Sequence, residues 1–184
     1  MPETQQPQRS RGFSKEMIVA LSANAVSIIT LLIFIYQTNL MREQQHISVW
    51  PYLEWLPSCC SEEFGAYIQV ENKGIGPAAV QSVTVRLNGK EMNSVEELFT
   101  KAVGHSNFDY YTSTVESRVL APGEKIKMIS IPDINWAVKV DSVLRRNGLE
   151  IEICYCSVYE DCWTCTGTSS MPTKRCTRSG VIKF

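Results

Sequence analysis

The chain has 184 residues, of which 44% are hydrophobic and 20% are charged, and these proportions are ordinary for one folded domain. They exclude a chain that is disordered throughout. The formal net charge is −1, and the lysines and arginines are spread along the chain rather than clustered. Because nucleic-acid binding needs a concentrated positive surface, we expect no nucleic-acid partner.

The first predicted element is an apolar segment from Met17 to Tyr36, which has twenty residues and no charge. A helix rises about 1.5 Å per residue, so about 20 residues cross about 30 Å of hydrocarbon. A buried core helix is one competing interpretation, but such helices are usually shorter and have a polar face. A cleaved signal peptide is another, but its cleavage site should follow the apolar region. Here the small-x-small site, Ala23-Asn24-Ala25, lies inside the segment. The pattern predicts an uncleaved membrane anchor.

The basic residues around this segment predict its orientation. Three precede it and one follows it within about 20 residues, the window in which the positive-inside bias is counted: Arg9, Arg11 and Lys15, then Arg42. We expect the N-terminus in the cytoplasm and the following domain in the periplasm or outside the cell. Residues 1–14 are polar and rich in Gln and Pro, which predicts a disordered cytoplasmic tail.

One face of the apolar segment has small and polar residues at helical spacing: Ala20, Ala23, Asn24, Ser27 and Thr30. Such a face permits close contact between membrane helices, so an oligomer through this helix is one interpretation. An undistinguished face with tolerated hydroxyl groups is the other. Residues 15–45 are predicted to form the membrane helix and a short juxtamembrane stalk.

An extended stretch is expected to begin near Ile47. Pro51 limits it to the edge of a sheet, because proline has no backbone N–H to donate. Trp50, Tyr52 and Trp55 fit either an aromatic belt at the lipid headgroups or the first strand of a folded core. A polar stretch separates them from the apolar segment, which favours the core.

Residues 66–92 alternate between apolar and polar residues, as half-buried antiparallel strands do. The apolar positions are Ile68 and Val70, and then Val83, Val85 and Leu87. Between these strands, Gly74 and Gly76 are expected to supply positive φ angles.

Two turn signals complete this pattern. Asn88-Gly89 is a strong hairpin signal, and Pro122-Gly123 lies between two further apolar runs. Several short strands separated by turns predict a β-sandwich.

Two helices are predicted within this β domain. In residues 94–103, Ser94 and Glu97 form a capping box ahead of an apolar stripe. In residues 133–148, Asp133 can cap the start of a helix and Asn147-Gly148 can end it. A minimal sandwich does not need these helices, so they either cover a sheet edge or shape a binding surface.

Three short motifs carry a resemblance to a known family. They are V-x-N-x-G-x-x-x-A, V-x-L-x-N-G-K and L-x-P-G-E, with the matching residues Val70, Asn72, Gly74, Ala78, Val85, Leu87, Asn88, Gly89, Lys90, Leu120, Pro122, Gly123 and Glu124. In this respect residues 66–131 resemble the bacterial cell-adhesion-related immunoglobulin-like domains often called CARDB or APHP. The resemblance implies an immunoglobulin-like β-sandwich that acts in surface or periplasmic interaction, and it carries over no catalytic residue.

Four of the seven cysteines lie in the stretch "EIEICYCSVYEDCWTC", residues 150–165. Cys154 and Cys156 alternate with aliphatic residues and so share one face of a predicted strand. If the chain turns near Tyr159 and returns, Cys156 lies opposite Cys162. Opposed residues lie about 4.5–5.5 Å apart at Cα, within disulfide range, and an oxidising compartment favours pairing. We predict a Cys156–Cys162 bond.

A second bond, between Cys154 and Cys165, is predicted with the same hairpin, although their alignment is one residue out of register. The remaining cysteines are Cys59, Cys60 and Cys176. Because adjacent cysteines rarely bond to each other, one of the first two, Cys60 in our assignment, is expected to pair with Cys176. Seven is an odd number, so at least one thiol should be free or bonded to another chain.

The alternative for this hairpin is a zinc or thiol-redox site. Four thiolates, Cys154, Cys156, Cys162 and Cys165, can close a tetrahedral zinc site, although a C-x-C spacing is tight for one. Cys162-Trp-Thr-Cys165 also has a C-x-x-C spacing, but a thioredoxin-like motif needs a helix N-terminus that this stretch does not predict.

Enzyme motifs are otherwise missing from the sequence, which has two histidines, His46 and His105, each interpreted as a solvated side chain. We predict no catalytic residue, no resident metal and no cofactor. The sequence predicts a mainly β protein with an N-terminal transmembrane helix, in which residues 46–184 form an extracytoplasmic immunoglobulin-like β-sandwich with two inserted short helices. Its expected role is binding or scaffolding with a protein partner. A small lipid or ligand carrier is a third interpretation, and it requires a pocket.

Overall fold

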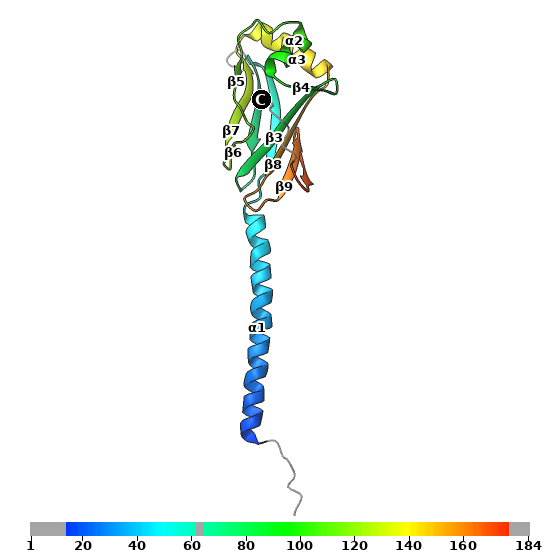
Figure 1. The fold of residues 1–184 in the computed structure, drawn as a ribbon. Coiled ribbons are helices and arrows are strands. Elements are labelled where there is room, and N and C mark those ends of the chain that lie inside the picture. The colour runs from blue at the N-terminus through cyan, green and yellow to red at the C-terminus, as the bar shows by residue number, and fades with distance from the viewer. Residues whose placement is uncertain (1–13, 62–64, 177–184) are drawn as a thin grey trace, which may run out of the picture. The chain divides into compact units, whose positions relative to one another are not determined.

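The computed structural model describes residues 14–61 and 65–176, and its contacts divide the chain into two units, Met1–Gln45 and His46–Phe184 (Figure 1). Apart from Ser14, the predicted disordered tail lies outside the described residues. We describe each unit separately.

The first unit consists of most of helix α1 (Lys15–Ser48). None of its residues is buried, and its most apolar 18-residue window has a mean hydropathy of 2.5. The hydroxyl groups of Ser27 and Thr30 donate to the carbonyls of Ala23 and Val26, so the helix satisfies these polar groups internally. The helix is long and apolar enough to cross a membrane, a test that signal sequences also pass. It extends to Ser48, slightly beyond the position near Ile47 where an extended stretch was expected.

The second unit contains two antiparallel sheets. The first sheet has the strand order β1-β2-β7-β5, formed by β1 (Leu53–Ser61), β2 (Gly65–Asn72), β7 (Lys125–Ile131) and β5 (Tyr111–Thr112). The second has the order β10-β9-β8-β3-β4, formed by β10 (Ser169–Thr173), β9 (Cys162–Thr166), β8 (Leu149–Cys156), β3 (Ala78–Leu87) and β4 (Lys90–Met92). The short strand β6 (Val119–Leu120) also pairs with β3.

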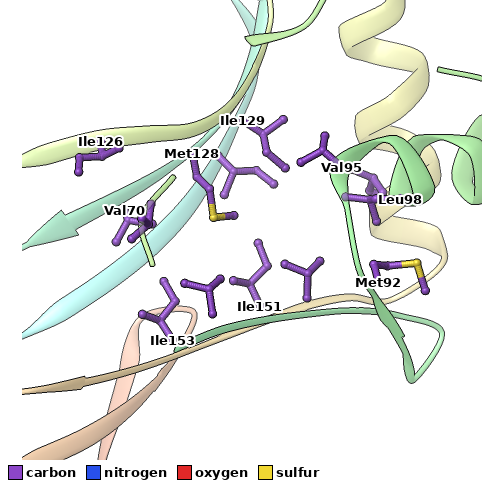
Figure 2. Packing of buried hydrophobic residues seen from close by; sticks show 14 of the residues in the cluster. Val70, Met92, Val95, Leu98, Ile126, Met128, Ile129, Ile151 and Ile153 are labelled. Carbon is purple, nitrogen blue, oxygen red and sulfur yellow. The ribbon is translucent and has the colours of Figure 1, made fainter. Parts of the chain in front are cut away.

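The two sheets enclose one hydrophobic core. Figure 2 shows Val70 and Met128 of the first sheet facing Ile151 and Ile153 of the second. All four side chains are buried, and Ile151 and Ile153 occupy alternate positions of β8 because successive side chains on a strand point to opposite faces. The predicted mainly β class with an apolar N-terminal helix is therefore confirmed.

Helices α2 (Val95–Val103) and α3 (Ile134–Arg146) lie at the same end of the sheets (Figure 1). The predicted caps are present, since Ser94 Oγ accepts from the Glu97 amide and Asp133 Oδ1 accepts from the Trp136 amide. Both helices bury an apolar face in the common core: Val95, Leu98 and Phe99 from α2, and Ala137, Val140 and Leu144 from α3. They are thus part of the core rather than additions to a complete sandwich.

The loop between β2 and β3 is organised by Asn72, which is fully buried. Its Oδ1 accepts from the amides of Tyr52 and Gly74, and its Nδ2 donates to the carbonyls of Gly76 and Leu120. These four bonds use the full capacity of the side-chain amide. One asparagine therefore holds together the segment before β1, the glycine loop and the strand before the Pro122-Gly123 turn.

The prediction of positive φ angles at Gly74 and Gly76 is wrong, because neither has one. A Cβ at Gly74 would lie 2.3 Å from the Tyr52 amide nitrogen, and a Cβ at Gly76 would lie 1.8 Å from the Val49 carbonyl oxygen. Both glycines are therefore needed for close approach to the backbone before β1. By contrast, the predicted Asn88-Gly89 hairpin joins β3 to β4 with φ angles of 52° and 71°.

Strand β1 belongs to the first sheet but is also bonded to the second. The Trp55 indole N–H donates to the Ile151 carbonyl over 2.8 Å, and the Trp55 amide donates to the Gly167 carbonyl. The side chain of Trp55 packs against the core, as the core interpretation predicts, whereas Trp50 is 47% exposed. Near the same strand, the buried Tyr155 hydroxyl accepts from the Leu53 amide and donates to Ser170 Oγ.

Candidate functional sites: a cysteine hairpin and an apolar pocket

The cysteine hairpin consists of β8 and β9 joined by a turn over residues 157–161. In its register Cys156 pairs with Cys162, Cys154 pairs with Thr164, and Ile153 pairs with Cys165. The turn is closed by the Ser157 amide, which donates to the Asp161 carbonyl. Residues opposite each other across the hairpin share one face, so Cys165 lies on the face of Ile153, which is the core face.

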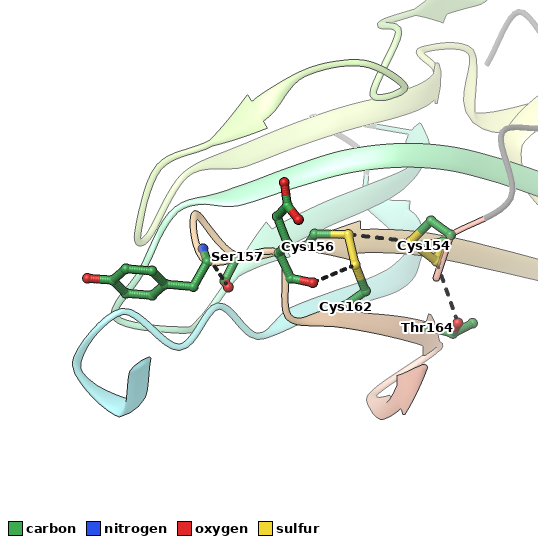
Figure 3. The surroundings of a disulfide bond; sticks show 8 residues. Cys154, Cys156, Ser157, Cys162 and Thr164 are labelled. Atoms are coloured by element: carbon green, nitrogen blue, oxygen red, sulfur yellow. Dashed lines mark hydrogen bonds between the residues drawn. A yellow bond between two sulfur atoms is a disulfide. The ribbon is translucent and has the colours of Figure 1, made fainter. Parts of the chain in front are cut away.

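Two disulfides involve the cysteines on the other face of the hairpin (Figure 3). The predicted Cys156–Cys162 bond is present. The predicted Cys154–Cys165 bond is wrong, because the shift of one residue in register turns Cys165 to the opposite face. Cys154 is bonded to Cys176 instead, across a sequence separation of 22 residues. This second bond attaches the segment after β10 to β8.

The predicted Cys60–Cys176 bond is also wrong, since Cys59 and Cys60 are bonded to each other. Cys60 has a φ of 72°, and the pairing of β1 with β2 is irregular between Ser58 and Ser61. This irregular backbone accommodates a bond between neighbours that a regular strand would not allow. Cys59 belongs to the first sheet and lies near α3, with its Sγ 3.9 Å from the Ala137 carbonyl oxygen, whereas Cys176 is held at the second sheet.

The remaining thiol, Cys165, is fully buried. Burial raises its pKa to about 11, because a thiolate is disfavoured in an apolar environment. Its Sγ lies 3.4 Å from the Gly167 carbonyl oxygen, to which the thiol donates. A protonated, inaccessible thiol is a poor nucleophile and a poor metal ligand, so Cys165 is unsuited to the C-x-x-C role.

Three sulfur atoms nevertheless lie close together. The Sγ atoms of Cys156, Cys162 and Cys176 are all within 4.8 Å of one another, and those of Cys156 and Cys176 are 3.8 Å apart without a bond. The thiolate set suggested by the sequence therefore changes, with Cys176 in the place of Cys165. In the described state these sulfurs are held in disulfides, which do not ligate zinc as thiolates do.

His46 is half-buried and His105 is exposed, and the rings of both histidines contact other side chains. His46 Nδ1 lies 2.7 Å from Asp161 Oδ2, and its ring stacks on Tyr159 with centroids 4.4 Å apart. His105 contacts the edge of Trp136, which also stacks on Phe108.

The pocket that the carrier interpretation requires lies between the first sheet and α3 and has a volume of about 310 Å³. Its walls are largely apolar and come from β1, β2, β7, α2, α3 and the start of β8: Trp55, Pro57, Ala66, Ile68, Phe99, Ile129, Ile131, Val140, Leu144 and Leu149. Ligand pockets in proteins occupy about 300–1,000 Å³ and combine apolar walls with a few polar groups. The pocket therefore reaches the lower end of that range.

The charged residues that line the pocket are Asp141 and Arg145, one turn apart on α3. Arg145 Nε donates to Asp141 Oδ2 over 2.7 Å, and this bond raises the pKa of Arg145. The Arg145 side chain is 58% exposed and that of Asp141 is 19% exposed. The ion pair thus gives an otherwise apolar pocket one polar edge.

No protein-family model, curated protein or solved structure matches the chain. The pocket residues carry no sequence signal of their own, because they come from six elements and most belong to ordinary strand and helix patterns. The apolar stripe of residues 133–148 indicated which side of α3 would be buried, but not that the burial would leave a space.

Proposed function

We propose that this protein is a non-enzymatic, single-pass membrane-anchored binding module that presents an extracytoplasmic, immunoglobulin-like β domain. The observation that carries the proposal is the apolar pocket between the first sheet and α3. A pocket of this size bounded by Trp55, Ile68 and Leu144 leaves apolar surface without a packing partner, and an apolar guest would supply one.

Three further observations support the proposal. Helix α1 has the length and hydropathy of a membrane span, and the basic bias around it favours a cytoplasmic N-terminus. The disulfides suit an oxidising compartment on the other side of the membrane. The described cysteines are bonded or buried, and this arrangement suits structural stabilisation better than catalysis.

The immunoglobulin-like part of the proposal rests on two sheets around one core and on the motifs that resemble CARDB or APHP domains. In V-x-N-x-G, Asn72 makes four hydrogen bonds and Gly74 allows close backbone approach. These roles give the motif a physical basis in the turn at the end of β2. They support a domain used for interaction, with a partner recognised through the pocket or the surface around it.

A small apolar probe tests the binding function. We expect millimolar toluene to raise the unfolding temperature of the full chain in lipid nanodiscs, because a ligand that binds only the folded state stabilises it. Ser58→Trp should remove this increase, since Ser58 lines the pocket from β1 and the indole would fill it. Ser142→Trp, an exposed position of α3 outside the pocket, is the matched control and should keep the increase.

Two outcomes would count against the proposal. An unchanged unfolding temperature of the wild-type protein would show that the pocket takes no apolar guest. An equal increase in wild type and Ser58→Trp would locate the effect elsewhere. Val140→Phe fills the pocket from α3 instead of β1 and gives an independent second variant if Ser58→Trp does not fold.

The second candidate function is thiol-redox or zinc binding by the cysteine hairpin, favoured by the proximity of the Cys156, Cys162 and Cys176 sulfurs. The 3.8 Å separation of the Cys156 and Cys176 sulfurs is close to the spacing of about 3.8 Å expected between two thiolates around a tetrahedral zinc with Zn–S bonds of about 2.3 Å. Two-electron reduction of each of the two disulfides by a dithiol would free the thiols of Cys154, Cys156, Cys162 and Cys176.

Zinc titration of the reduced protein tests this alternative. If the alternative is correct, the reduced protein should bind one zinc ion per chain. Cys176→Ser should lose this binding and Cys165→Ser should keep it. Binding that is lost in Cys165→Ser but kept in Cys176→Ser would contradict the ligand set drawn from the structure.

A further inference from the structure

We propose that the pocket between the first sheet and α3 holds the alkyl chain of a fatty acid, with its carboxylate bound by Arg145. This inference rests on the proposed binding function and names the class of ligand. It follows from the shape of the pocket, from the charge at its edge and from the anchor that joins the domain to a membrane.

The walls of the pocket favour an alkyl chain. Apart from the edge of α3 and backbone at Gly148, the lining is mostly apolar, and Ile68, Ile129 and Val140 are each less than 9% exposed. No buried side-chain nitrogen or oxygen among the described residues lacks a hydrogen-bond partner, and away from α3 the polar side chains of the lining are those of Ser58 and Tyr67. The guest inside the pocket should therefore be hydrocarbon.

The volume sets the length of that hydrocarbon. An apolar cavity of about 150 Å³ holds one benzene, which has six carbons. The pocket, at about 310 Å³, is about twice as large. A chain of about twelve carbons would fill it, and each buried methylene contributes about 0.8 kcal/mol of transfer free energy. A saturated chain of this kind has the flexibility to follow a pocket whose walls come from several elements.

Arg145 favours an anionic head group. Among the described residues its guanidinium is bonded to Asp141 through Nε, which leaves the two terminal nitrogens as donors. Those nitrogens have the geometry to donate a pair of hydrogen bonds to a carboxylate. Asp141 already accepts from Arg145 and is the less exposed of the two, so it opposes an anion less than its formal charge suggests.

The anchor supplies the source of the ligand. Helix α1 is joined directly to the β domain, and an apolar helix of this kind would keep the domain beside a bilayer, where fatty acids concentrate. The anchor therefore gives the domain a local supply of fatty acids in the bilayer.

Photolabelling of the full chain in nanodiscs tests the proposal. The probes are a twelve-carbon fatty acid with a diazirine near its methyl end and the corresponding alcohol, and the labelled residues are mapped by mass spectrometry. We expect the acid to label peptides that contain residues 66–68 or 140–144, and we expect excess dodecanoate to suppress this labelling more strongly than excess dodecanol. Labelling of α1 reports only partition into the bilayer and serves as the internal reference.

Arg145→Gln and its neighbour Arg146→Gln form the matched pair. Both remove one positive charge from the last turn of α3, but only Arg145 lines the pocket. Arg145→Gln should weaken binding of the acid about tenfold or more, because a hydrogen bond to a charged group is lost. Binding of the alcohol should stay unchanged. Arg146→Gln should leave both unchanged.

The outcomes separate this inference from the proposed function. Equal pocket labelling by acid and alcohol, unaffected by Arg145→Gln, would overturn the carboxylate assignment while the binding function stands. An equal loss of acid binding in Arg145→Gln and Arg146→Gln would show a general effect of charge and would also overturn the carboxylate assignment. Labelling confined to α1 with both probes would overturn the pocket as a binding site, and with it the proposed function.

Discussion

Cys165 lies directly opposite Ile153 in the β8–β9 hairpin, and both side chains are completely buried. The pair explains why the last cysteine of a four-cysteine stretch is excluded from the disulfides. Cys154, its predicted partner, is opposite Thr164 and points to the other face. Successive residues of a strand point to opposite faces, so a shift of one position decides whether a cysteine forms a disulfide or packs in the core.

Peptide mapping of alkylated, unreduced protein should therefore recover Cys156 joined to Cys162 and Cys154 joined to Cys176. Cys165 should react only after denaturation, because its thiol is inaccessible in the folded chain. A peptide that joins Cys154 to Cys165 would contradict the register of the hairpin.

Cys156→Ser should expose the Cys162 thiol to alkylation and reduce the free energy of unfolding by about 2 kcal/mol. The effect is small for a disulfide because the bond closes a short loop, which loses little entropy on closure. Chemical denaturation of wild type and variant measures this difference. Cys59→Ser is the control, since it removes a bond elsewhere and should leave Cys162 protected. Alkylation of Cys162 in folded Cys59→Ser would contradict the independence of the two sites.

The buried thiol of Cys165 predicts a pH dependence of stability at high pH. Its pKa in the folded state is about 11, above the ordinary value of 9.0, so the folded protein holds this proton more tightly than the unfolded chain. The associated stability is complete below about pH 9 and is lost as the pH rises through about 11. Two pKa units correspond to about 3 kcal/mol at most.

Urea unfolding of wild type and Cys165→Ala at several pH values measures this contribution. Cys165→Ala removes the titrating group, so the difference in unfolding free energy between the two proteins should shrink between pH 9 and pH 11. Groups that do not interact with Cys165 contribute equally to both proteins, whereas the pKa of Tyr155 is raised by burial and also by the charge of Cys165, so Cys165→Ala/Tyr155→Phe measured against Tyr155→Phe isolates the thiol. A difference that stays constant over this range would show that Cys165 does not titrate as its burial predicts.

Gly74→Ala should destabilise the β domain by about 1–3 kcal/mol or more, the range expected for overpacking. The new Cβ would lie 2.3 Å from the Tyr52 amide nitrogen and 2.5 Å from the Trp50 carbonyl oxygen, and backbone atoms cannot move aside cheaply. Gly89→Ala is the control, because its Cβ would meet nothing within 4 Å. The destabilisation expected there comes only from its positive φ of 71°. Thermal unfolding that ranks Gly89→Ala as the more damaging change would refute the close-approach role.

The membrane topology is tested with reporters appended after residue 184. An enzyme that is active only outside the cytoplasm should be active there, because more basic residues precede the apolar segment than follow it. Charge reversal at Arg9 and Arg11 should reduce this activity, and Arg42→Gln should not. Activity of a reporter that works only in the cytoplasm would overturn the extracytoplasmic location and weaken the case for stable disulfides.

Much of the local structure follows from the sequence. The caps at Ser94 and Asp133, the Asn88-Gly89 hairpin and the alternation through Val83 and Val85 depend on contacts between residues close together in the chain. Such contacts repeat with a fixed period or spacing and can be read without knowing the fold. The length and apolarity of the N-terminal helix are predictable for the same reason.

The tertiary structure alone decided the features that depend on distant segments. Cys176 reaches Cys154 only because β10, β9 and β8 lie side by side. Position 76 requires glycine because the backbone of residue 49 lies against it and leaves no room for a Cβ. The pocket depends on how far α3 lies from the first sheet, a distance set by all the side chains packed between them. Periodicity tells which face of an element is buried, but the register and spacing between elements depend on packing across the whole core, and these decide which cysteines bond and where space remains.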